Sequence, residues 1–226
     1  MNINYSVVNL INNYRNNMYQ ILLASSSKDK KKEFMQLMKQ NSYNVKLIMR
    51  NIVKDIGIIP ETGNSYLDNA LIKANIVYQY YQLPVLSDDS GIELTDFSNF
   101  PGIYSNRYAG YNANDQDNYN KLQHFLLKKQ LNFTAARYSC VLVYQFQINK
   151  YQKFEGKWNG RICIKKSVHG GFGYDPMFIP AGCNTTVEKL DLFYKNTYSH
   201  RAIAVKKLIK YIANRKIKNI NNIINM

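Results

Sequence analysis

Short apolar runs alternate with amphipathic helical stretches along most of this chain, and the alternation limits the folds that are open to it. Tyr19–Ala24 is expected to be a buried strand that passes directly into three serines and a lysine-rich helix. A second strand is expected over 45–49 and a helix over 65–81, which Pro84 follows. Because strands and helices alternate, we predict an α/β fold with a mixed β-sheet and flanking helices.

The middle of the chain carries more strand signal. The segment PVLSDDSGIEL is expected to form a buried strand, a carboxylate-rich turn at Gly91 and a further strand. A helix is expected over 115–129, and two strands over 135–148 and 157–166. The last helix is expected to begin at Ser199, whose hydroxyl can cap it.

A chain of 226 residues suits one well-packed α/β domain. We predict that this domain covers 19–212, with a polar, Asn-rich extension over 1–18 and a low-complexity tail over 213–226. The three cysteines lie far apart without the spacing of a zinc site, which favours a reducing, cytoplasmic location. No apolar stretch approaches the roughly 20 residues that span a bilayer, so no membrane partner is expected.

The formal net charge of +15 raises the question of a polyanionic partner such as nucleic acid. Asn, Ile, Lys and Tyr are abundant, and A/T-rich codons specify these residues, so compositional drift towards lysine also explains the charge. The densest basic cluster, residues 28 and 30–32, fits a solvated helix face. Nucleic acid is therefore the second choice of partner.

The first candidate for chemistry is the segment LASSSKDK. Hydroxyl groups and free backbone N–H groups at a helix N-terminus, beside Lys28 and Lys30, suit the oxygens of a phosphate. Serine-rich turns also serve simply as helix N-caps, so this segment alone leaves both interpretations open.

The second candidate is the pair Asp88 and Asp89, followed by Ser90. Two adjacent carboxylates would repel one another if buried together, and a hard cation relieves that repulsion. Mg²⁺ commonly bridges one or two carboxylates to substrate phosphates. An ordinary solvated turn is the alternative interpretation.

Two further clusters carry ring systems and hydrogen-bonding groups. In GGFGYDPMF, Phe172 and Tyr174 offer flat faces and Asp175 offers an acceptor for a nucleobase, although a buried turn with core aromatics would look the same. In SHR, His200 and Arg201 present donors at a helix start. A histidine there would be unremarkable by itself.

Six segments in this order resemble the Ham1/RdgB family of inosine triphosphate pyrophosphatases. They are LASSSKDKKKEF, PETGNSYLDNALIKA, LSDDSGIEL, FPGIYSNRYAG, GGFGYDPMF and KNTYSHRAIAV. The resemblance implies an elongated α/β fold whose long mixed sheet and two lobes surround a nucleotide cleft, and it implies a homodimer. The implied activity is hydrolysis of ITP, dITP and XTP to the monophosphate and pyrophosphate with Mg²⁺.

The resemblance also implies roles for particular residues. Glu61 and Asp89 would hold magnesium, and Asp89, with Asp88 beside it, would accept a proton. Phe172 would stack on the base. The substrate-binding set would be Ser25, Ser26, Ser27, Lys28, Asp29, Lys30, Lys73, Ser90, Phe172, Gly173, Tyr174, Asp175, Lys195, His200 and Arg201, of which Lys195, His200 and Arg201 would read the keto edge of the purine. The family usually has Asn where this chain has Ser27, so one phosphate or ribose contact is expected to differ.

Two other interpretations are weighed against this one. LASSS followed by basic residues also resembles the opening of the Maf-type pyrophosphatases, whose substrates would be pyrimidine or modified nucleotides, but the later segments disfavour that family. The charge also fits a basic nucleic-acid-binding protein on a decayed pyrophosphatase scaffold. The intact Asp88, Asp89, Lys73 and His200 argue against decay.

Overall fold

The computed structural model describes residues 19–41, 45–164 and 172–224. The predicted extension over 1–18 and the first glycines of the GGFGYDPMF segment lie outside the described residues. The limits assigned to the domain, the extension and the tail stay predictions.

A mixed β-sheet forms the centre of the described structure and confirms the predicted fold class. Its seven strands are β1 (Tyr19–Ala24), β2 (Val45–Ile48), β3 (Val85–Leu94), β4 (Phe100–Pro101), β5 (Phe133–Gln147), β6 (Lys150–Cys163) and β7 (Phe178–Pro180). The order is β2-β1-β3-β5-β6-β7, and β4 pairs with the end of β3. Strands β2, β1 and β3 run parallel, whereas β3, β5, β6 and β7 pair antiparallel. Strand β3 therefore lies where the parallel and antiparallel parts meet.

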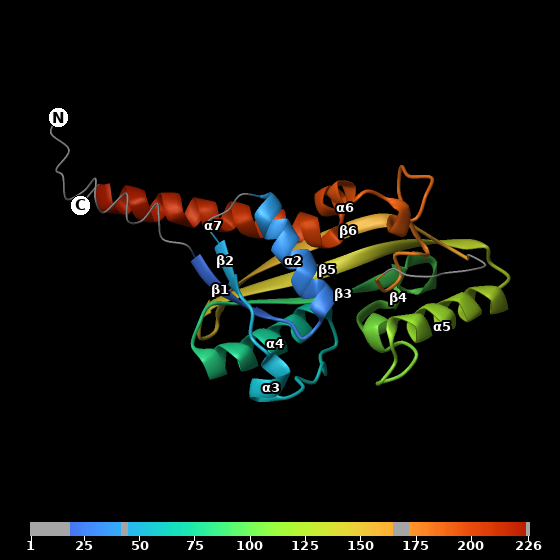
Figure 1. Ribbon diagram of the computed structural model, residues 1–226, viewed down its shortest axis with the longest axis horizontal. Helices are drawn as coiled ribbons and strands as arrows, with labels where there is room; N and C mark the ends of the chain where they lie inside the picture. The colour runs from blue at the N-terminus through green and yellow to red at the C-terminus, as the bar shows by residue number, and fades with distance from the viewer. Residues whose placement is uncertain (1–18, 42–44, 165–171, 225–226) are drawn as a thin grey trace.

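Helices cover both faces of this sheet (Figure 1). They are α2 (Lys28–Gln40), α3 (Ile52–Ile56), α4 (Tyr66–Tyr81), α5 (Asp115–Lys128), α6 (Leu192–Tyr198) and α7 (His200–Ile224), with short 3₁₀ turns η1 (Thr95–Phe97), η2 (Gly102–Arg107) and η3 (Val187–Lys189). Helices α2 and α7 lie on one face and α3 and α4 on the other (Figure 1). Helix α5 covers the far end of the long hairpin that β5 and β6 form (Figure 1).

The hydrophobic core follows the alternation of the strands. On β3, Leu86 packs with α2 and α7, whereas its neighbour Val85 packs with α4. Successive side chains of a strand point to opposite faces, so one strand supplies both layers. The distal half of β3, with Ile92 and Leu94, packs in a separate cluster with α5 and β7. At one end of the molecule, helices cover both faces of the sheet, and at the other end α5 packs against it. Strands β3, β5 and β6 run through both ends.

Serine side chains begin three of the helices. The hydroxyl of Ser27 accepts a hydrogen bond from the Lys30 amide, and that of Ser65 accepts one from Asp68. Ser199 accepts from Ala202 at the start of α7, as expected. The buried stripe of α7 contains the side chains of Ala202, Val205, Leu208, Ile209 and Ile212. Helix α7 continues past 212 to Ile224.

The prediction of a turn at Gly91 is wrong. Strand β3 is continuous, and Gly91 pairs with Ser139 inside a ladder to β5 that covers the whole of β3. A Cβ at Gly91 would lie 2.3 Å from the Gly102 carbonyl oxygen and 2.5 Å from Ser105 Oγ. Glycine is therefore needed at this position because η2 packs against the strand there, and no turn is involved.

Candidate active site

A cavity of about 630 Å³ collects nearly all of the predicted site residues. Its lining includes Ser25, Ser26, Ser27, Lys30, Glu61, Lys73, Asp88, Asp89, Ser90, Phe172, Gly173, Tyr174, Asp175, Lys195, His200 and Arg201. Lys28 and Asp29 are not in the lining, and both are exposed on the first turn of α2. Segments far apart in the sequence are thus brought together around one space, although the roles of the residues stay predictions.

The carboxylates of Asp88 and Asp89 lie in the middle of β3, where the residues are 1% and 4% exposed. Because neighbouring residues of a strand face opposite ways, the two carboxylates have different partners. Asp88 Oδ2 lies 3.0 Å from Lys30 Nζ and 3.5 Å from Arg201 Nε. Asp89 Oδ1 lies 3.3 Å from Lys73 Nζ. Each carboxylate thus has basic partners of its own, which lower the repulsion between the two, and the magnesium site stays a prediction.

These partners give the two aspartates opposite electrostatic properties. Burial raises the pKa of Asp88, but Lys30 and Arg201 outweigh burial and hold that pKa well below its ordinary value. Burial also raises the pKa of Asp89, and Lys73 only partly offsets it, so this pKa stays above its ordinary value. Asp88 is a fixed anion, while Asp89 is the better proton acceptor of the two.

The ammonium group of Lys73 lies between two carboxylates. Lys73 Nζ is 2.9 Å from Glu61 Oε1, in addition to its contact with Asp89. Burial lowers the pKa of Lys73, but Asp89 and Glu61 outweigh burial and raise it overall. The lysine is therefore charged, and two carboxylates, one from the loop before α4 and one from β3, turn towards one cationic centre.

Arg107 and Asn69 hold this group in place; both fall within the matched segments of the sequence, which gave neither of them a role. Arg107 donates to Glu61 Oε2 at 2.7 Å and to the Glu61 carbonyl oxygen at 3.2 Å. The buried Asn69 side chain donates to Asp89 Oδ2 at 3.0 Å and accepts from the Gly63 amide at 2.8 Å. The loop that carries Glu61 is thus tied to η2 through Arg107 and to α4 through Asn69, which in turn holds Asp89 of β3.

At one end of the cavity, the serine turn meets the N-terminus of α2. The first N–H groups of a helix have no partner within it, and they attract anions together with the helix dipole. Lys30 and Lys73 add positive charge to the lining of the same space. This end of the cavity suits phosphate oxygens.

The other end combines an aromatic ring with a buried ion pair. The ring centroid of Phe172 lies 5.9 Å from Lys195 Nζ and 5.9 Å from the Arg201 guanidinium carbon. Lys195 Nζ lies 2.6 Å from Asp175 Oδ2. Tyr174 donates its hydroxyl to the Ser105 carbonyl oxygen. A flat ring beside fixed donors suits a planar heterocycle.

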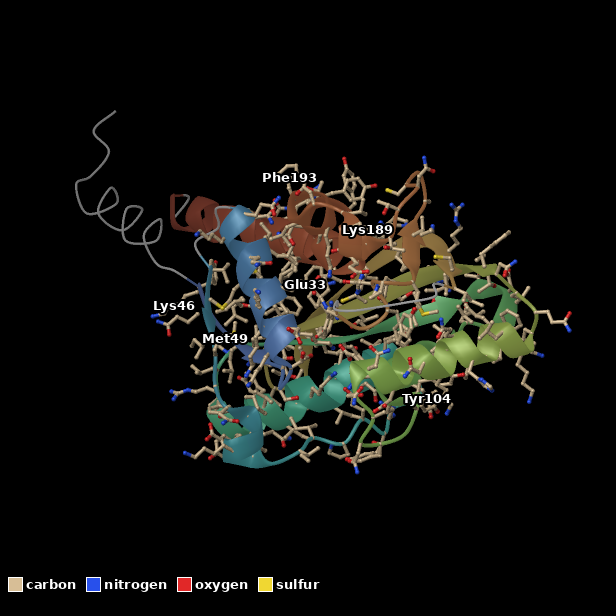
Figure 2. The ribbon with its side chains drawn as sticks, turned by 45° about the vertical axis from the view of Figure 1, so that its right-hand side comes forward. Glu33, Lys46, Met49, Tyr104, Lys189 and Phe193 are labelled. Atoms are coloured by element: carbon tan, nitrogen blue, oxygen red, sulfur yellow. The ribbon has the colours of Figure 1, made fainter. Side chains whose placement is uncertain are left out.

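The guanidinium group of Arg201 is held by protein acceptors. It donates to Glu33 Oε2 at 2.7 Å, to Ser90 Oγ at 2.7 Å and weakly to Asp88. Glu33 projects from α2 towards the middle of the molecule, whereas Lys46 on β2 points outwards (Figure 2). Through these donors Arg201 links α2, β3 and α7, and because it also lines the cavity, its role at the purine's keto edge stays a prediction. Glu33 had a sequence signal, since it falls beside Phe34 and Leu37 on the buried face of α2.

His200 is buried at the start of α7, with its imidazole stacked on the ring of Tyr138. The ring centroids lie 4.7 Å apart and the planes differ by 7°. Within the described part of the chain, His200 Nδ1 has no hydrogen-bond partner. Burial, followed by the charges of Arg201 and Lys195, lowers the pKa of His200 well below its ordinary value. The imidazole is therefore neutral near pH 7, with one donor and one acceptor.

Replacing His200 with Gln is expected to remove a pH dependence from the free energy of unfolding. Because the folded-state pKa is depressed, the unfolded chain takes up the proton first. The stabilising contribution is complete above about pH 6.5 and is lost as the pH falls, by at most about 1.4 kcal/mol per pH unit. Denaturant unfolding of both proteins between about pH 5 and 7.5 measures the difference.

The matched control for this comparison is His124→Gln, because His124 is exposed on α5. That variant should keep the pH slope of the unmodified chain. Equal slopes for the unmodified chain and His200→Gln would contradict the assignment of a neutral, buried imidazole.

Fold and site together define an α/β protein whose cavity joins a cationic end to an aromatic end. The chain belongs to the Ham1 family, whose sequence profile matches residues 21–211. It is 45% identical to the dITP/XTP pyrophosphatase of Malacoplasma penetrans (strain HF-2) over 199 residues. These residues cover 87% of this chain and 100% of that relative. It is 38% identical over 194 residues to the dITP/XTP pyrophosphatase of Shewanella oneidensis, with 85% of this chain and 93% of the relative covered.

Solved structures of Ham1 proteins have the same fold. A HAM1 protein from Coxiella burnetii superimposes with a TM-score of 0.76 at 32% identity, covering 87% of this chain and 100% of that chain. The Ham1 protein of Staphylococcus aureus gives a TM-score of 0.73 at 28% identity, covering 87% and 99%. Among the described residues, no helix is long and apolar enough to cross a membrane.

Proposed function

We propose that this chain is a nucleoside triphosphate pyrophosphatase that hydrolyses non-standard purine nucleotides, namely ITP, dITP and XTP, to the monophosphate and pyrophosphate. Such a reaction removes deaminated purines from the nucleotide pool. The observation that carries the proposal is the shared cavity of Lys30, Lys73, Asp89 and Phe172. A polyphosphate fits the cationic end and a purine fits the aromatic end. The names of the relatives support the same substrate class.

Glu61 and Asp89 are the proposed magnesium ligands. Both carboxylates already face one cation, the Lys73 ammonium group, so the donor set suits a hard cation with oxygen ligands. The described residues contain no group of three or more His, Cys, Asp or Glu side chains that could hold a metal ion. The described part of the chain would therefore supply only these two carboxylates as ligands. Substrate phosphate oxygens would complete the coordination, as is usual for Mg²⁺. When bound, the ion supplies charge neutralisation at the phosphates.

The proposed reaction is attack of water on the α-phosphorus. Asp89 accepts a proton from the water as the new P–O bond forms, and the bond between the α-phosphorus and the bridging oxygen breaks. Lys73 and Lys30 neutralise the charge that develops on the departing pyrophosphate. The raised pKa of Asp89 suits this role, because a base works best when its pKa lies near the working pH.

Selection of the base would follow from donors at the aromatic end. The 6-oxygen of inosine or xanthosine accepts hydrogen bonds from donors such as Lys195 and His200. The 6-amino group of adenosine is itself a donor, so it would face the donors of the protein and no hydrogen bond would form between them. Each such mismatch of buried polar groups costs about 1–3 kcal/mol. A homodimer and a cytoplasmic location complete the proposal.

Release of pyrophosphate from a panel of nucleotides with magnesium tests the function. We expect kcat/KM for ITP, dITP and XTP to exceed that for ATP by at least about tenfold. A clear preference for dTTP or UTP would favour the Maf-type interpretation. Tight nucleic-acid binding in a retardation assay at about 0.15 M salt, without hydrolysis, would favour the nucleic-acid-binding interpretation.

A further inference from the structure

Tyr138 lies at the aromatic end of the cavity, where no sequence motif pointed to a function. It belongs to β5, and its register neighbours are Ile92 on β3 and Trp158 on β6. The residue is 8% exposed, and it contributes to the cavity lining. A tyrosine in the middle of a central strand is therefore both a core residue and part of the wall of the cavity.

The hydroxyl of Tyr138 controls one oxygen of Asp175. It donates to Asp175 Oδ1 at 3.1 Å, while Lys195 Nζ donates to Asp175 Oδ2 at 2.6 Å. With a donor on each oxygen, the carboxylate cannot rotate without breaking a hydrogen bond. Lys195 is thereby held beside the face of Phe172, although its own chain segment is a short surface helix.

The ring of Tyr138 controls the plane of His200. The two rings are stacked nearly parallel. The ring of Tyr138 is in turn held by other aromatic residues of the core. Phe178 meets Tyr138 edge-on at 4.8 Å between centroids, and Trp158 packs against Phe178 at 5.5 Å. Because this aromatic group belongs to the sheet, Tyr138 gives the imidazole a rigid support.

Building on the function proposed above, we infer that Tyr138 is a positioning residue that fixes Asp175, Lys195 and His200 in the arrangement that discriminates between purine bases. Burial, followed by the charge of Asp175, raises the pKa of Tyr138 well above its ordinary value, so the hydroxyl stays a donor. Recognition of the 6-oxygen depends on donors fixed in direction, since a mobile lysine could turn away from the 6-amino group of adenosine and avoid the unfavourable contact.

Tyr138→Phe tests the inference because it keeps the stacking ring and removes only the hydroxyl. We expect kcat/KM for ITP to fall about tenfold, with most of the loss in KM, since a hydrogen bond to a charged group is removed. The preference for ITP over ATP should fall by a similar factor. Pyrophosphate release from each nucleotide over a range of concentrations gives both values.

Tyr119→Phe is the matched control. Tyr119 belongs to the same hydrophobic cluster, is buried, and has a hydroxyl without a partner within the described residues, but it does not line the cavity. That variant should keep the ITP preference. An unchanged preference in Tyr138→Phe, or an equal loss in Tyr119→Phe, would overturn the positioning role while leaving the proposed function intact. Absence of ITP hydrolysis by the unmodified chain would instead overturn the function, and this inference with it.

Discussion

Asp89→Asn is expected to lower kcat/KM for ITP by at least about two orders of magnitude. The amide has nearly the shape of the carboxylate, but it neither accepts a proton at neutral pH nor serves as an anionic ligand of a hard cation. Asn69 and Lys73 each donate a hydrogen bond to one oxygen of the Asp89 carboxylate. In the variant, the NH₂ group of the new amide would replace one of these oxygens and would face Asn69 or Lys73, which is also a donor. Steady-state pyrophosphate release with magnesium measures the loss.

Asp68→Asn is the control for the loss of one carboxylate. Asp68 is exposed on α4, the helix that also carries Lys73, and it lies outside the cavity lining. This variant should keep kcat/KM within about twofold, because exposed substitutions away from a site have small effects. Activity of Asp89→Asn within about tenfold of the unmodified chain would remove Asp89 from the proposed chemistry.

The elements of the fold were predictable because their signals are local. Tyr19–Ala24 forms a strand as predicted, and α5 ends one residue before the predicted limit. A run of apolar residues or a capping serine acts over a few neighbours, so the sequence alone contains that information. Ser65 and Ser199 are examples, since each begins a helix through its own hydroxyl.

The error at Gly91 has a different origin. Glycine beside two aspartates is typical of a turn, and only a tertiary contact gives it another purpose. Here η2 packs so closely on β3 that a side chain would collide with Gly102. The buried aspartates likewise fit a strand because basic groups from α2, α4 and α7 neutralise them.

Residues that hold others in place were the hardest to predict. Asn69, Arg107 and Tyr138 each donate a hydrogen bond to a carboxylate that is distant in the chain, by 20, 46 and 37 positions respectively. A single asparagine or tyrosine carries no pattern that would distinguish it from an ordinary core or surface residue. Their contributions come from the packing of β3, α4, η2 and β5, which is a tertiary property.

The N-terminus of α7 reaches the site because Gly156 lets it approach the sheet. Gly156 lies on β6, opposite Cys140 of β5. A Cβ at this position would lie 1.9 Å from the carbonyl oxygen of His200 and 2.9 Å from the Ala204 amide nitrogen. Both contacts are with backbone atoms, so a side-chain rotation cannot relieve them. The position of His200 and Arg201 thus depends on a glycine from a different element.

Gly156→Ala is therefore expected to destabilise the protein and to impair the site together. Separating α7 from β6 should cost at least about 2 kcal/mol, or a Tm about 5–10 °C lower, because inserting a methyl group into a closely packed contact is unfavourable. The shift of Arg201 away from Asp88 and Ser90 should lower kcat/KM further, even at temperatures where the variant is folded. Calorimetry and ITP hydrolysis measure the two effects, and Lys157→Ala, on the exposed side of the same strand, should change neither. An unchanged Tm in Gly156→Ala would show that α7 and β6 do not meet at this residue.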